Sequence, residues 1–326
     1  MIKEINKDPI GCLLEFLFLT KESNNSKYKE REEWKAVNAP NTYNIFWNGS
    51  IEPHIFINII LGKKDDPNKK AEIKRIFRIL NHHNMIEPYP YDDSINPQRM
   101  VITLLGEELL LKNKYLEVIN GLKYIVDKWK SSVAKIYDSK EPGIGTGFLI
   151  DSNKLATAKH VVEQIKNIEI QFENDPIRYQ AGKIKLPTKT NDLDIAIIEL
   201  NTPVKDKLPF SISNDYNLLD DVVILGYPPV PMSDDAYLVA NKGEISSIIT
   251  LYRNGIQHLI VSTLIRGGNS GGPIINSRGD VIGVVTENLY KEVPKEELNK
   301  FGLNEGLAFS AGICSDWLKD LHKGII

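Results

Sequence analysis

The sequence predicts an α+β protein of two domains, with a mainly helical N-terminal part at residues 1–130 and an all-β C-terminal part at residues 131–326. Three observations predict this. The chain has 326 residues, and domains usually have ~100–200 residues. Apolar residues follow helical spacing in the first part, whereas short apolar runs alternate with Gly, Pro, Asn and Asp turns in the second. Hydrophobic residues at 42% and charged residues at 25% are ordinary globular usage, so the chain can bury a sizeable core.

Apolar spacing gives the N-terminal part its helical character. Asn68 is suited to begin a helix and Asn81–Asn84 to end it. Between them, apolar residues recur at i, i+3, i+4 and i+7, which places them on one face of a helix. These residues are Ile73, Ile76, Phe77 and Leu80.

Two short strands and a second helix are predicted next. Met85–Ile86 and Met100–Thr103 predict strands, and the residues rich in proline and aspartate between them predict a loop. Leu105–Lys130 predicts one further helix. A helix, a two-stranded wing and a final helix resemble a winged-helix module over roughly residues 50–115. This resemblance implies a winged-helix-like domain with a regulatory or recruiting role.

The C-terminal part reads as a series of short strands separated by turns, a spacing typical of a barrel or a sandwich. A short helix at Cys314–Lys323 is expected to close the chain. The predicted strands are Ser132–Tyr137, Thr146–Ile150, Lys154–Thr157, Ile168–Phe172, Ile195–Leu200, Val222–Leu225, Gly243–Thr250, His258–Ser262, Pro273–Asn276, Val281–Thr286 and Gly306–Ala311.

Charge and cysteine usage exclude several classes of protein. Lys and Arg number 40 and Asp and Glu 43, so the net charge of -3 gives no global attraction to nucleic acid or to an anionic membrane. The 2 cysteines, Cys12 and Cys314, form neither a disulfide framework nor a zinc site. Glu15 interrupts the N-terminal apolar run, so we expect no signal peptide and no membrane span. We therefore expect a soluble, cytoplasmic protein without a metal or other cofactor.

Three stretches of the C-terminal part carry side chains suited to catalysis. The first, GIGTGFLIDSNKLATAKHVV, contains His160 near its end. The second, NDLDIAIIEL, has Asp194 before an apolar strand, with Asp192 as a rival carboxylate. The third, RGGNSGGPIIN, holds Ser270 between Asn269 and Gly271.

These residue types suit nucleophilic catalysis. A serine hydroxyl is a weak nucleophile at neutral pH and needs a base. Histidine has a pKa suited to that task, and a carboxylate can hold the imidazole in the required tautomer. The glycines on both sides of Ser270 allow tight turns, so that backbone amides can converge on one point as an oxyanion hole.

The chain order His160, Asp194, Ser270 resembles that of chymotrypsin-fold, trypsin-like serine proteases. The string Gly268–Pro273 is similar to the nucleophile loop of this family. Asn269, directly before the serine, is similar to the bacterial high-temperature-requirement branch. The resemblance covers roughly residues 131–322 and implies a double barrel of six strands each, with the catalytic groups in the cleft between the barrels.

Four further strings support this resemblance and occur in the family's order. Thr157–His160 resembles the segment around the catalytic base, and Asp194–Ile198 the segment that carries its carboxylate. Gly279–Val284 is similar to the hairpin after the serine. Gly306–Phe309 resembles the strand that closes the specificity pocket. The chain ends shortly after these segments, so we expect no PDZ domain of the kind that many high-temperature-requirement proteases carry.

The resemblance implies a role for each matching residue. Ser270 would attack the scissile carbonyl, His160 would take its proton, and Asp194 would orient the imidazole. The amides of Gly268 and Ser270 would bind the oxyanion, with Asn269 between them.

The resemblance also implies the position of a specificity pocket, and this sequence departs from the trypsin pattern there. Asn269 carries no charge to pair with a newly cut N-terminus, so we expect activity without N-terminal processing. Leu264, six residues before the serine, favours small or apolar substrate residues over Arg or Lys. The residues expected to line the pocket are Leu264, Thr286, Glu287, Asn288 and Ala308.

Three functions remain open from the sequence. The leading hypothesis is an intracellular serine endopeptidase that cleaves a protein or peptide, with residues 1–130 gating the site or binding a regulatory partner. The alternative is a DNA-binding winged-helix regulator whose protease domain cleaves itself or a partner on a signal. Basic and acidic residues nearly balance over residues 1–126, so nucleic acid is not the favoured partner. The third is a non-catalytic peptide-binding module.

Overall fold

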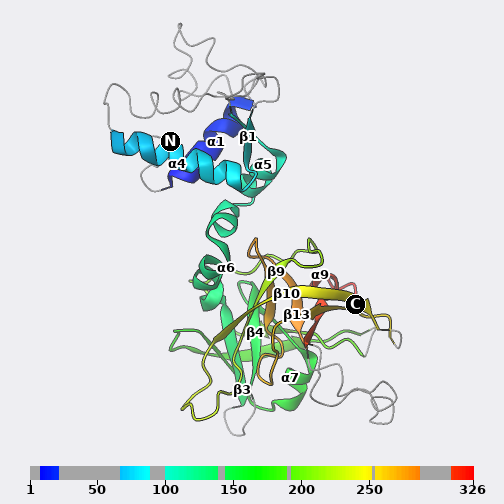
Figure 1. Cartoon of the computed structure of the whole chain (residues 1–326). Coiled ribbons are helices and arrows are strands. Elements are labelled where there is room, and N and C mark those ends of the chain that lie inside the picture. Colours follow the sequence, from blue (N-terminus) through cyan, green and yellow to red (C-terminus); the bar gives the residue numbers. More distant parts are fainter. Residues whose placement is uncertain are drawn as a thin grey trace. The chain divides into compact units, whose positions relative to one another are not determined.

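The structure is a computed structural model that describes residues 8–21, 67–88, 100–138, 144–188, 192–251, 254–286 and 310–326 (Figure 1). The chain forms two compact units, Met1–Ile119 and Asn120–Ile326. The division falls inside helix α6 (Tyr115–Trp129), and the boundary predicted after residue 130 follows the end of this helix. Among the described helices, none is long and apolar enough to span a bilayer.

The N-terminal unit contains the predicted helix and the predicted pair of strands. Helix α4 (Pro67–His82) buries the predicted apolar face, and α1 (Pro9–Lys21) packs against it. Strands β1 (Ile86–Pro88) and β2 (Met100–Ile102) pair antiparallel, as the sequence predicts. The winged-helix character of this unit stays a prediction.

The prediction of one continuous helix over Leu105–Lys130 is wrong. The segment forms two helices, α5 (Leu104–Leu111) and α6. They separate because Asn113 has a φ of 54°, a left-handed conformation that ends a helix. Within α6, Gly121 departs from helical geometry with a φ of 69° and a ψ of -166°. Glycine adopts such angles without steric cost, so α6 bends there.

The C-terminal unit holds two closed antiparallel barrels of six strands, which confirms the predicted double barrel of an α+β protein. In the first barrel the spatial order is β3-β4-β5-β8-β7-β6. Its strands are β3 (Val133–Asp138), β4 (Ile144–Asp151), β5 (Lys154–Thr157), β6 (Ile168–Phe172), β7 (Arg178–Lys185) and β8 (Ala196–Leu200).

The second barrel has the spatial order β10-β11-β14-β13-β12-β9. Its strands are β9 (Asp221–Gly226), β10 (Val239–Thr250), β11 (Gln257–Val261), β12 (Pro273–Asn276), β13 (Val281–Val285) and β14 (Ser310–Cys314). The predicted strand Gly306–Ala311 overlaps β14 at Ser310 and Ala311, and its first four residues lie outside the described residues. Helix α9 (Ser315–Lys323) follows, as predicted.

Each barrel has its own core, and a third cluster of buried residues joins them. Phe148 of the first barrel and Leu225 of the second belong to this shared core. The second half of α6 adds Trp129, which stacks on Phe210 at a centroid distance of 4.8 Å. Helix α9 adds Leu318. The shared core fixes one barrel against the other, so that loops from both can contribute to one site.

Candidate active site

His160 lies where the first barrel changes from strand to helix. Strand β5 ends at Thr157, and His160 sits in the first turn of α7 (Lys159–Gln164), whose Val161 and Val162 are buried. Asp194 precedes β8, and β8 pairs with β5 in a register that sets Ala196 opposite Thr157. The pairing therefore brings the histidine and the carboxylate to the same edge of the barrel.

Both oxygens of the Asp194 carboxylate bind His160. The imidazole Nδ1 lies 2.7 Å from Oδ2, and the His160 backbone amide donates to Oδ1 at 2.9 Å. Two contacts from one carboxylate fix both the backbone and the ring of the histidine. Asp192, the rival in the sequence, is exposed and makes no such contact.

Ser270 lies in the loop between β11 and β12 and is 7% exposed. Two glycines in left-handed conformations shape this loop, Gly268 with a φ of 87° and Gly271 with a φ of 83°. The Gly271 amide donates to the carbonyl of Val285 at 2.7 Å, and the Val285 amide donates to Gly272 at 2.9 Å. The serine is therefore held by backbone hydrogen bonds to the neighbouring strand β13.

The serine loop packs directly on the turn that leads to His160. A Cβ placed on Gly271 would lie 2.2 Å from Thr157 Oγ1 and 2.8 Å from the Ala158 amide nitrogen. Only glycine fits such an approach. The structure thus joins His160 and Asp194 by direct hydrogen bonds and brings the Ser270 loop against the residues just before His160.

Two backbone amides of the serine loop are suited to bind an anion. Within the described residues, neither the Gly268 amide nor the Ser270 amide donates a hydrogen bond. The amide of Asn269 between them donates instead to the carbonyl of Arg266 at 3.1 Å. The Asn269 side chain is buried, and its polar atoms find no partner in the described part of the chain.

Two of the five predicted pocket residues are described. Leu264 is 60% exposed and precedes the serine loop, which leaves its side chain accessible. Thr286 follows β13 directly, and its side chain is buried. The other three, Glu287, Asn288 and Ala308, lie outside the described residues.

Over the described ranges, no three His, Cys, Asp or Glu side chains gather as metal ligands do. Both cysteines are buried thiols, and burial raises the pKa of Cys314 to about 11.

One residue of the site was missed at the sequence level. Thr146 lies inside the first stretch, yet nothing in the sequence distinguishes it from an ordinary strand threonine. Its side chain donates to the Gly268 carbonyl at 2.6 Å and accepts from the Tyr227 amide at 3.0 Å.

Part of the C-terminal unit is similar to known proteins. Residues 145–284 match the family model of the trypsin-like peptidase domain. The chain is 30% identical over 171 residues to Protease Do-like 2, chloroplastic, of Arabidopsis thaliana, which covers 48% of this chain and 27% of that protein. It is 33% identical over 150 residues to the probable periplasmic serine endoprotease DegP-like of Chlamydia pneumoniae, which covers 45% of this chain and 29% of that protein. The chain thus spans less than a third of the length of either relative.

Among solved structures, the serine endoprotease from Yersinia pestis matches with a TM-score of 0.46 at 19% identity, over 63% of this chain and 66% of that chain. The family model covers a part of the chain that includes His160, Asp194 and Ser270. Together with the two closed barrels, the match to the trypsin-like peptidase domain supports a chymotrypsin-like fold for the C-terminal unit.

Proposed function

We propose that the protein is a serine endopeptidase that cleaves peptide bonds of a protein substrate through an acyl-enzyme intermediate. Ser270 attacks the scissile carbonyl, and His160 takes the hydroxyl proton and delivers it to the leaving amine. Asp194 holds the imidazole and stabilises the imidazolium. The amides of Gly268 and Ser270 bind the oxyanion of the tetrahedral intermediate.

The observation that carries this proposal is the double contact between Asp194 and His160. With Nδ1 bound to the carboxylate at 2.7 Å, the imidazole proton resides on Nδ1 and the basic lone pair on Nε2. That tautomer is the one that can accept a proton from a serine. A purely structural histidine would not need a carboxylate that also fixes its own backbone amide at 2.9 Å.

The test is covalent labelling of the full chain by a fluorophosphonate probe. We expect labelling of the wild type and none of Ser270→Ala, because the probe reacts with an activated serine. His160→Ala should also lose the label while keeping its fold. A peptide-library digest with Ser270→Ala as the control then shows whether small or apolar residues precede the cleaved bond. A wild type that binds peptides without labelling or cleavage would indicate a peptide-binding module instead.

We further propose that residues 1–130 restrain or target the protease and that the protein acts in the cytoplasm. The support for the first point is that the N-terminal unit has a core of its own, which includes Leu13, Phe77 and Ile102. A regulatory role predicts that substitutions on the exposed surface of this unit change cleavage of protein substrates more than cleavage of short peptides. Equal effects on both substrates would count against it.

A second function, DNA binding, is favoured by one surface of α4. Lys74, Arg75 and Arg78 are exposed, while the opposite face of the helix is buried. Among the described residues, none of the three basic side chains forms an ion pair, so they are open to phosphate groups. DNA binding predicts salt-dependent duplex association by the full-length Ser270→Ala chain. Association should weaken when the three basic residues become glutamine.

A further inference from the structure

Thr146 connects the two barrels at the serine loop. It lies in β4 of the first barrel and is fully buried, at 0% exposure. Its hydroxyl donates to the carbonyl of Gly268 at 2.6 Å and accepts from the amide of Tyr227 at 3.0 Å. Both partners belong to the second barrel, so the single proton and a lone pair of one hydroxyl are used across the interface.

The backbone of Thr146 holds the other side of the same loop. Its amide donates to the carbonyl of Ser270 at 2.9 Å. The hydroxyl therefore fixes the peptide between Gly268 and Asn269, and the amide fixes the peptide after Ser270. The peptide that carries the Ser270 amide lies between these two and is thereby constrained on both sides.

The serine loop needs hydrogen bonds from outside because its own sequence has few side chains that could fix its conformation. Gly267 and Gly268 have no side chains, and a Cβ at Gly267 would meet nothing within 4 Å. Glycine populates left- and right-handed conformations about equally, so the loop alone does not specify the direction of its peptides. The hydrogen bond that the Gly268 carbonyl accepts and the one that the Asn269 amide donates must therefore select the observed turn, in which Gly268 has a φ of 87°.

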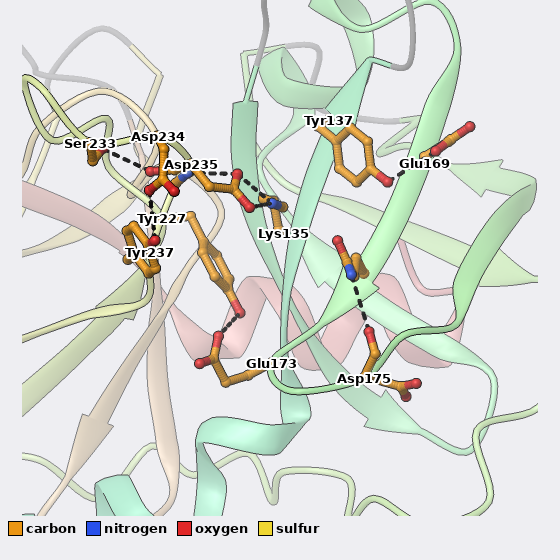
Figure 2. A network of polar contacts seen from close by, with 12 residues as sticks. Lys135, Tyr137, Glu169, Glu173, Asp175, Tyr227, Ser233, Asp234, Asp235 and Tyr237 are labelled. Atoms are coloured by element: carbon orange, nitrogen blue, oxygen red, sulfur yellow. Dashed lines mark hydrogen bonds and ion pairs between the residues drawn. The ribbon is translucent and has the colours of Figure 1, made fainter.

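The second partner of the hydroxyl is itself held in place. The buried Tyr227 donates its phenol proton to Glu173 of the first barrel at 3.0 Å (Figure 2). Burial raises the pKa of the Tyr227 hydroxyl most, and the negative charge of Glu173 raises it further. The hydroxyl therefore stays neutral and acts as a donor. In the loop between β9 and β10, which begins with Tyr227, Asp235 pairs with Lys135 of the first barrel at 2.8 Å (Figure 2). These contacts hold the segment that carries the Tyr227 amide, so this amide keeps its position as donor to the Thr146 hydroxyl.

We propose that Thr146 is a positioning residue that holds the amides of Gly268 and Ser270 in the orientation that binds the oxyanion. The inference rests on the proposed endopeptidase function. Thr146 touches no reacting atom and acts through the peptide that it holds. The β-branched side chain suits this task, because its χ1 is restricted.

The test compares Thr146→Val with Thr146→Ser in the full chain. Valine keeps the shape and removes the hydroxyl, and serine keeps the hydroxyl. We expect Thr146→Val to lose about 10²–10³-fold in kcat, the effect of one oxyanion donor. KM should change less than about threefold, since the substrate-binding surface is untouched. Thr146→Ser should stay within about tenfold of the wild-type kcat. A Thr146→Val enzyme with wild-type kcat overturns the proposal.

A matched control removes a comparable buried hydrogen bond away from the site. The hydroxyl of Ser132 donates to the carbonyl of Leu208 at 2.7 Å, so Ser132→Ala should lower the melting temperature and leave kcat unchanged. Should Thr146→Val fail to fold, Thr146→Ala takes its place as the variant without the hydroxyl.

Amide hydrogen exchange gives a readout that does not depend on turnover. The peptide that contains Gly268–Gly271 should exchange faster in Thr146→Val than in the wild type or Thr146→Ser, while exchange in α9 stays unchanged. Equal exchange in all three proteins overturns the positioning role. If the wild type neither cleaves nor labels, the proposed function fails, and the exchange result still decides whether Thr146 orders the loop.

Discussion

The two barrels hold their parts of the site by different means. The first barrel fixes His160 through a side chain, the Asp194 carboxylate, which binds both the ring and the backbone amide. The second barrel fixes Ser270 through its backbone, with left-handed glycines at Gly268 and Gly271 and a bond from the Gly271 amide to strand β13. The first half of the site therefore depends on a charged side chain, and the second on glycine conformations and hydrogen bonds of the loop backbone.

This difference predicts two kinds of response to substitution. A change at the carboxylate should leave the fold intact and affect the chemistry, because the first barrel has its own core around Ile136, Leu155 and Ile198. A change at a loop glycine should displace the backbone itself. Substitutions in the two regions therefore separate loss of rate from loss of structure.

The largest expected effect is on rate. Asp194→Asn should lower kcat by about 10⁴-fold with little change in melting temperature, because the amide favours the wrong imidazole tautomer. The matched control is Asp138→Asn in the same barrel, whose carboxylate accepts from the amides of Lys166 and Asn167 at 3.0 and 3.1 Å. Asp138→Asn should be less stable and keep its kcat. Equal losses of kcat in both variants would contradict the proposed role of Asp194.

The next effect is on structure. Gly271→Ala places a methyl group 2.2 Å from the Thr146 carbonyl oxygen in a left-handed conformation, which should cost about 3 kcal/mol or more of unfolding free energy. Gly255→Ala has a φ of 71° and meets nothing within 4 Å, so it should cost only about 1–2 kcal/mol. Denaturant unfolding of the two variants measures the difference. Similar losses would mean that the φ angle, and not the close approach of the two loops, requires Gly271.

The smallest expected effect depends on pH and concerns the link between the barrels. The hydrogen bond from Lys135 and that from the Ala236 amide lower the pKa of Asp235 below its ordinary value of 3.8. The pair therefore adds stability above that pH, and this stability is lost as the pH falls through the lowered pKa. The gain is small because the Asp235 side chain is 63% exposed.

Thermal melts between about pH 3 and pH 6 test this point, a range set by the ordinary aspartate pKa. The advantage of the wild type over Asp235→Asn should shrink toward the acid end. Asp234→Asn is the neighbouring control, because Asp234 accepts from Tyr237 and binds no lysine. A constant advantage at every pH would exclude the ion pair as its source.

Much of the C-terminal unit could be predicted because its strands alternate clearly or are wholly apolar. Strands β5, β6 and β12 occur with the predicted bounds. Strand β7 was missed because half of its residues are exposed and an irregularity between Ala181 and Ile184 breaks the alternation. A bulge shifts the side chains of a strand from one face to the other, so a period-2 pattern cannot reveal it.

The site was predictable where residue type specifies chemistry and not where it depends on fold. His160 and Asp194 could be named from their strings, and the structure pairs them. Thr146 could not be named from its string, because its role depends on the Gly268 carbonyl and the Tyr227 amide, which the fold brings to it from the second barrel. The break between α5 and α6 was likewise hidden, since Asn113 in a left-handed turn has no effect on the apolar pattern around it.

The glycine inside α6 has a mechanical consequence. A single non-helical residue, Gly121, interrupts α6, so the direction of the helix depends on the two backbone torsion angles of that residue. At Gly121 a Cβ would meet nothing within 4 Å, so the backbone conformation and not steric contact requires the glycine there. Gly121→Ala would favour helical torsion angles at this position and therefore one continuous, stiffer helix from Tyr115 to Trp129.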